Sequence, residues 1–290
     1  MKKILIFCWI FTLITSCARE SKNKNLMYQN IVILSDMSSR VKNKPLKDIE
    51  KIKEILHFFR EECVKPGKKI GDKSVILFST FSREVVTSID LNNFKSLAKK
   101  QRFVNSTGEF KDSGLNKKIQ DFEQEVITTY NNSNDPGLDL ISILTEKIKN
   151  ESIIKENSYL TDGIDTTFVN FDNHINIFTD GYLEYKGKSI NDEYYFGESE
   201  INEIRKVCLL KNITISEVLE LNESFKLPAV KDKKNKHINL HILETHQRDK
   251  NYTFQTFSNR KGTRDNEILK VIWETWARES GFKSFEWKIY

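Results

Sequence analysis

Residues 30–40 read NIVILSDMSSR, an apolar run that ends abruptly in polar residues. The run is rich in β-branched side chains and shows no alternation, which is typical of a strand buried on both faces of a parallel sheet. Its polar end begins with Asp36 and Ser38. Ligands of parallel α/β sheets bind outside the carboxyl ends of the strands, so this segment predicts both a fold class and the place of a site.

Strands and helices are predicted to alternate along the rest of the chain. Helical spacing of apolar residues is found at 45–63, 115–130, 140–148, 201–210, 215–221 and 265–280, and strand patterns at 74–81, 85–89, 175–179, 238–242 and 285–289. This alternation predicts a doubly wound, mostly parallel α/β sheet between two layers of helices, a Rossmann-like three-layer sandwich. One domain over residues 29–290 is expected.

A second strand end carries matching oxygen ligands. Residues 178–181 read FTDG and place Asp180 after the predicted strand at 175–179. If the two strands are neighbours, Asp36, Ser38 and Asp180 converge on one edge of the sheet. Two carboxylates and a hydroxyl form an all-oxygen site of the kind that Mg²⁺, Mn²⁺ or Ca²⁺ prefers. The structural alternative is that each carboxylate only caps a helix or closes an Asx-turn.

The order of these motifs resembles the von Willebrand factor type A (vWA) domain. That family builds a metal-ion-dependent adhesion site from a strand followed by Asp-x-Ser-x-Ser and a later strand followed by Thr-Asp-Gly. The segment FSTFS at 78–82 is also similar to the family's second strand. The resemblance covers residues 29–290 and implies that Asp36, Ser38 and Asp180 hold a divalent cation.

Two positions depart from the family's pattern. Arg40 stands where the second serine of the motif would be, and Leu138 stands near the place of the family's metal-binding threonine. Arg40 would either put its own charge at the metal position or point away and leave Ser39 to contribute. Asp135 or Asp139 would supply a substitute oxygen. Two alternatives stay open, a site with Mg²⁺ or another divalent cation and a site with none.

An aromatic and acidic loop follows the second motif, close to the expected edge. Exposed aromatic side chains are common in protein-binding surfaces, and packing against the domain is the alternative. The tyrosines of this loop are Tyr182, Tyr185, Tyr194 and Tyr195.

Residues 1–17 have the pattern of an export signal. Lys2 and Lys3 precede an apolar run at 4–14, which is shorter than the roughly 20 residues of a membrane-spanning helix. The segment ITSC at 14–17 resembles the lipobox of bacterial lipoproteins. The resemblance implies removal of residues 1–16, acylation of Cys17 and a flexible tether over 17–28, and an ordinary secretory signal is the alternative. Ala18, in place of aspartate, favours the outer membrane of a Gram-negative host, at its periplasmic face or at the cell surface.

Composition and motifs argue against nucleic-acid binding, a disulfide and the common catalytic motifs. The net charge is +5 with acidic and basic residues interspersed, so nucleic acid is not expected as a partner. Cys63 and Cys208 each lie on the apolar stripe of a predicted helix, which favours buried thiols over a disulfide. No nucleophile-elbow, phosphate-loop or dinucleotide motif is present, and no catalytic residue is expected.

We expect a membrane-anchored, extracytoplasmic vWA-like module that binds a protein partner through a degenerate metal-ion-dependent adhesion site. A metal-free scaffold of an envelope complex is the alternative. A phosphatase that uses Asp36 as its nucleophile is least favoured, because such enzymes carry a second acid where this chain has Ser38.

Overall fold

The computed structural model describes residues 23–38, 40, 45–69, 71–94, 96–132, 135–150, 153–161, 165–185, 193–259 and 261–290. Contacts divide the chain into two compact units, Tyr28–Lys155 with Asp172–Tyr290 and Met1–Met27 with Glu156–Phe171. The predictions for Cys17 and Ser39 lie outside the described residues. Within the described ranges, no helix has the length and apolar character needed to cross a membrane.

The larger unit is built on a mostly parallel sheet with the strand order β3-β2-β1-β5-β6-β9. β1 is parallel to β2, β6 is parallel to β5 and β9, and β3 is an antiparallel edge strand. The strands are β1 (Asn23–Ser35), β2 (Val75–Thr80), β3 (Val85–Asp90), β5 (Thr166–Phe178), β6 (Ile238–Glu244) and β9 (Ser284–Ile289). The order runs outward in both directions from the β1–β5 pair, which makes that pair the switch point where doubly wound sheets bind ligands.

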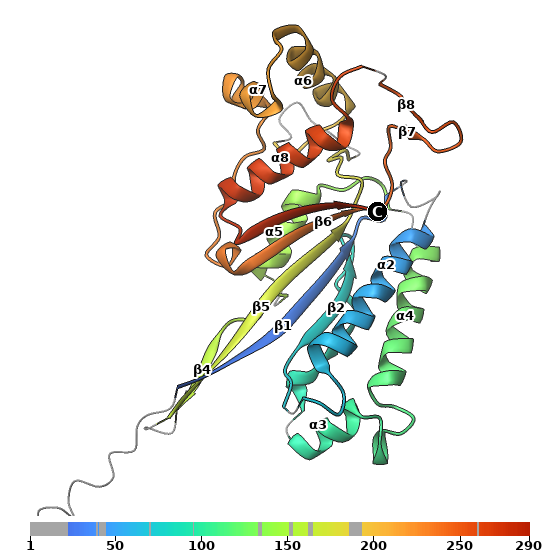
Figure 1. Cartoon of the computed structure of the whole chain (residues 1–290), viewed down its shortest axis with the longest axis vertical. Coiled ribbons are helices and arrows are strands. Elements are labelled where there is room, and N and C mark those ends of the chain that lie inside the picture. The colour runs from blue at the N-terminus through green and yellow to red at the C-terminus, as the bar shows by residue number, and fades with distance from the viewer. Residues whose placement is uncertain are drawn as a thin grey trace, which may run out of the picture. The chain divides into compact units, whose positions relative to one another are not determined.

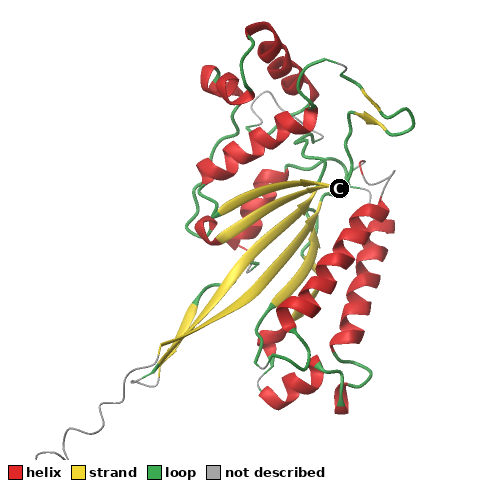
Figure 2. Cartoon of the chain, in the orientation of Figure 1, coloured by secondary structure: helices red, strands yellow, loops and turns green. Residues whose placement is uncertain are grey.

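Helices lie on both sides of this sheet (Figures 1 and 2). One side carries α2 (Pro45–Phe58), the π-helical turn η2 (Phe59–Val64) and α4 (Leu115–Asn132), and the other carries α5 (Leu140–Asn150), α6 (Glu198–Lys211), α7 (Ile215–Leu221) and α8 (Asp265–Ser280). This arrangement is compatible with the predicted three-layer α/β sandwich.

The described residues also form shorter elements. They are α3 (Leu97–Val104), the 3-10 turns η3 (Leu91–Asn93), η4 (Gly108–Phe110), η5 (Glu223–Phe225) and η6 (Asn235–His237), and the hairpin of β7 (Lys250–Asn251) and β8 (Thr256–Phe257). In the smaller unit, β4 (Ser158–Thr161) pairs antiparallel with the first residues of β5.

Two strands are longer than their sequence patterns predict. β1 begins at Asn23, inside the segment 17–28 that was expected to be a tether, and β5 begins at Thr166 rather than at 175. The first half of β5 is mostly half-exposed and pairs with β4, so it lacks the continuous apolar run by which a buried strand is recognised. Strand pairing, rather than burial, therefore extends β5.

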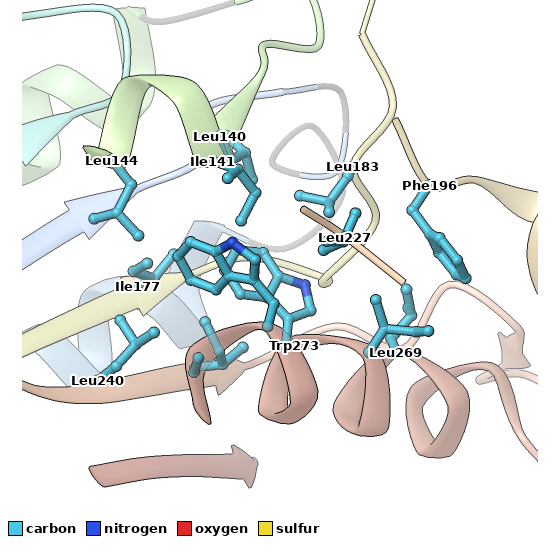
Figure 3. Packing of buried hydrophobic residues seen from close by; sticks show 14 of the residues in the cluster. Leu140, Ile141, Leu144, Ile177, Leu183, Phe196, Leu227, Leu240, Leu269 and Trp273 are labelled. Atoms are coloured by element: carbon cyan, nitrogen blue, oxygen red, sulfur yellow. The ribbon is translucent and has the colours of Figure 1, made fainter. Parts of the chain in front are cut away.

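Successive residues of the buried strands point to opposite faces of the sheet and so contribute to two hydrophobic cores, one on each face. In β1, Ile33 belongs to the core beneath α2 and α4, whereas Leu34 belongs to the core beneath α5 and α8. Figure 3 shows Trp273 of α8 in the second core, among leucine and isoleucine side chains from α5 and the strands. Cys63 and Cys208 lie in different cores as free thiols, so the prediction of buried thiols is confirmed.

Gly181 follows the end of β5 in a conformation that favours glycine. Its φ is +84°, and a Cβ atom at this position would lie 2.3 Å from Cη2 of Trp287. Its carbonyl oxygen accepts a hydrogen bond of 2.9 Å from Nε1 of Trp273. The backbone after Asp180 is therefore held by two tryptophans from α8 and β9.

We expect Gly181→Ala to lower the free energy of unfolding by more than Gly67→Ala. Gly67 has a similar φ of +74°, but nothing lies within 4 Å of a Cβ there. Both variants bear the left-handed backbone strain of roughly 1–2 kcal/mol. Only Gly181→Ala adds overpacking against Trp287, about 1–3 kcal/mol. Urea unfolding measures the difference, and equal losses would contradict the contact.

Candidate functional site

The three residues that the sequence selects meet at one cavity. The ends of β1 and β5 lie side by side, with the amide of Asp36 donating to the carbonyl of Phe178 at 2.9 Å. A cavity of about 610 Å³, called the rim cavity below, opens at this edge and is lined by Asp36, Ser38 and Asp180. Its other lining residues are Arg40, Gly137, Leu138, Leu140, Tyr182, Glu184, Tyr185, Tyr195, His246 and Arg248.

Asp36 is buried, and both of its oxygens accept hydrogen bonds from the protein. The backbone amide of Ser38 donates to Oδ1 at 3.0 Å, and the hydroxyl of Thr179 donates to Oδ2 at 3.1 Å. The first of these closes an Asx-turn, which was the structural alternative for this motif. Asp36 is therefore oriented by both strand ends.

Arg40 points inward and lies against Asp36. Its Nε is 3.5 Å from Oδ2 of Asp36, and the side chain is only 3% exposed. Its Nη2 donates to Asp48 at 2.9 Å and to the carbonyl of Phe178 at 2.7 Å. Burial alone would lower the pKa of Arg40, but Asp48 and Asp36 raise it above its ordinary value, so the guanidinium stays charged. Arg40 thus puts its charge beside Asp36 instead of pointing away from it.

Asp48 of α2 holds the other side of this arginine. It is 1% exposed and also accepts hydrogen bonds from the hydroxyls of Tyr130, at 2.9 Å, and Thr245. The Tyr130 hydroxyl lies 2.7 Å from that of Ser35, and burial raises the pKa of Tyr130 well above its ordinary value. Sequence reasoning missed Asp48, which looks like an ordinary acid in the first turn of a helix. The one signal in the sequence was Arg40 in place of the motif's second serine, because a buried arginine needs an acidic side chain beside it.

Asp180 is paired with a second arginine. Arg248, from the loop after β6, donates to Oδ2 of Asp180 from Nε at 3.2 Å and from Nη2 at 3.1 Å. Its guanidinium lies 3.7 Å from the ring centroid of Tyr182 and also pairs with Glu184. Burial raises the pKa of Asp180, and Asp180 with Glu184 raises that of Arg248 against the opposing effect of burial. No sequence motif marks Arg248.

The four tyrosines divide into two pairs. Tyr182 is buried and donates to Asp265 at 2.5 Å, and Tyr194 packs partly buried against the core. Tyr185 and Tyr195 are half-buried and line the rim cavity, and their rings meet edge to face with centroids 5.8 Å apart. The aromatic part of the cavity wall is therefore mainly Tyr185 and Tyr195, backed by Tyr182.

Asp139 has a structural role. It caps α5 by accepting from the amide and hydroxyl of Ser142, at 2.9 Å and 2.6 Å, and it does not line the rim cavity. Among the described residues, no group of three His, Cys, Asp or Glu side chains is arranged to hold a metal ion. The residues present fit a divalent cation poorly, because each carboxylate of the motif already faces a guanidinium.

No protein-family model matches the chain, and no curated protein matches it either.

Glu244 lies behind the site, at the end of β6. It is 1% exposed, and its Oε2 accepts a hydrogen bond of 2.9 Å from Nε1 of Trp287. Burial raises its pKa from 4.5 to about 7.

We expect Glu244 to make the fold less stable as pH rises. Its carboxyl is protonated in the fold below about 7, whereas in the unfolded chain it ionises near 4.5. The penalty is absent below 4.5, grows between 4.5 and about 7, and is complete above that, on the order of 3 kcal/mol. Urea unfolding of the wild type and Glu244→Gln across this range measures it. A stability difference that does not change with pH would contradict the burial of the charge.

Proposed function

We propose that this chain is an exported, lipid-anchored binding module of the vWA kind that holds a protein partner at the rim cavity without a metal ion. The observation that carries the proposal is the pairing of both motif carboxylates with arginines, Asp36 with Arg40 and Asp180 with Arg248. The anchor rests on the lipobox resemblance that ends at Cys17.

A divalent cation at this place would have to displace a buried arginine. Mg²⁺ requires oxygens at 2.0–2.1 Å in octahedral geometry, whereas the Nε of Arg40 lies 3.5 Å from Asp36. Moving Arg40 would leave Asp48 buried without its cation. Breaking a buried ion pair in this way costs roughly 3–5 kcal/mol. Charge balance therefore favours the metal-free alternative over the metal-dependent one.

The lining of the rim cavity suits a protein side chain. Three carboxylates and two guanidinium groups nearly balance in charge, and Tyr185, Tyr195 and Leu138 add aromatic and apolar surface. Tyrosine and arginine are enriched among residues that dominate protein–protein binding energies. The size of the cavity lies within the range of about 300–1,000 Å³ of binding pockets.

We expect a photo-crosslinking amino acid at Tyr195 to give one discrete crosslinked protein in the source cells, with equal yield in chelator. The matched control is Leu210 of α6, which is 75% exposed and away from the rim cavity. Immunoblots after irradiation give the readout. Loss of the product in chelator would support the metal-dependent alternative, and products that are the same at both positions would contradict a partner at the cavity.

A further inference from the structure

Two histidines face each other on the sheet, outside the rim cavity. His174 of β5 and His241 of β6 lie on neighbouring parallel strands, and Nδ1 of His174 is 3.0 Å from Nε2 of His241. Their strand neighbours Ile175 and Ile242 belong to the core beneath α5 and α8. Because side chains alternate along a strand, both imidazoles lie on the opposite face of the sheet. Their side chains are 27% and 17% exposed, so solvent reaches them.

The outer nitrogen of each ring contacts a carboxylate. Nε2 of His174 is 3.1 Å from Asp172, and Nδ1 of His241 is 3.0 Å from Glu286 of β9. An ionised carboxylate only accepts hydrogen bonds, so each neutral ring carries its proton on the outer nitrogen.

A lysine pairs with each of these carboxylates. The ammonium of Lys283 donates to Asp172 at 2.7 Å, and that of Lys288 lies 2.9 Å from Glu286. The tautomers of both histidines are therefore fixed from outside the pair.

The inner nitrogens then face each other with two lone pairs and no hydrogen between them. The ring centroids are 5.2 Å apart and the ring planes differ by 21°, so the two nitrogens lie close to the line between the rings. Two lone pairs at this distance repel unless a cation lies between them. That cation is either a proton or a metal ion.

We propose that the inner nitrogens of His174 and His241 bind a divalent transition-metal ion such as Zn²⁺, with water completing the coordination. Imidazole is a preferred ligand of zinc, copper and nickel. Metal-binding histidines almost always donate their other N–H to a carboxylate, carbonyl or water, which is the role of Asp172 and Glu286 here. In a tetrahedral zinc site with Zn–N distances of about 2.0–2.1 Å the two nitrogens lie roughly 3.3–3.4 Å apart. Zinc binding therefore requires a separation slightly larger than the 3.0 Å found here and a tilt of both rings off the line that joins them. This site is independent of the rim cavity and its function.

Zinc binding to the purified protein tests the proposal. Competition with a chromophoric chelator is expected to show one Zn²⁺ per chain, and excess Zn²⁺ is expected to raise the melting temperature by several degrees. Both effects should be lost in His174→Ala and in His241→Ala. His237→Ala is the matched control, because His237 is an exposed histidine next to β6, and it should bind zinc like the wild type.

A milder variant keeps the test valid if the alanine variants do not fold. Asp172→Asn retains both ligands but weakens the orientation of His174, so zinc affinity should fall about 10- to 100-fold. Zinc affinity should also fall as the pH is lowered, because protons compete for the same nitrogens. The proposal is overturned if the wild type takes up no zinc, or if His174→Ala, His241→Ala and Asp172→Asn all bind zinc as the wild type does. In that case the pair holds only a proton.

Discussion

A buried ion pair, Arg40 with Asp48, is the interaction on which the candidate site depends. The two side chains are 3% and 1% exposed, so neither charge is solvated by bulk water. Through hydrogen bonds this pair joins four places in the fold: the end of β5 at Phe178, α2 at Asp48, α4 at Tyr130, and Thr245 after β6. Isolated buried charges are strongly unfavourable, so these elements must meet in one geometry for Arg40 to be compensated.

The same constraint sets the chemistry of the rim cavity. Asp36 lies within reach of Arg40, while Asp180 is held by Arg248, whose side chain is 42% exposed. Both arginines line the rim cavity, but Arg40 is buried in the fold whereas Arg248 is open to solvent. A site with this charge balance is suited to binding a polar or aromatic side chain. It is less suited to concentrating a hard cation.

The buried middle of the fold could be predicted from the sequence because local patterns record it. The continuous apolar run that ends at Ser35 identifies β1, and the motifs after β1 and β5 identify Asp36, Ser38 and Asp180, which do converge. Arg248 was not predictable, because its place depends on where the loop after β6 crosses the sheet. The His174–His241 contact was missed for a similar reason. It depends on the register of β5 and β6, two strands about 60 residues apart in the sequence, which places Asn176 opposite His241.

The most direct test of the account is the melting temperature of the protein in chelator and in millimolar Mg²⁺, measured beside Asp36→Ala. Mg²⁺ is the suitable ion because it prefers oxygen ligands and binds a histidine pair poorly. The account predicts the same wild-type melting temperature in both conditions, because arginines already neutralise Asp36 and Asp180. A ligand present at a hundredfold over its dissociation constant stabilises the fold by about 2.7 kcal/mol. A rise of several degrees in the wild type that is absent in Asp36→Ala would therefore show a working metal site and contradict the account.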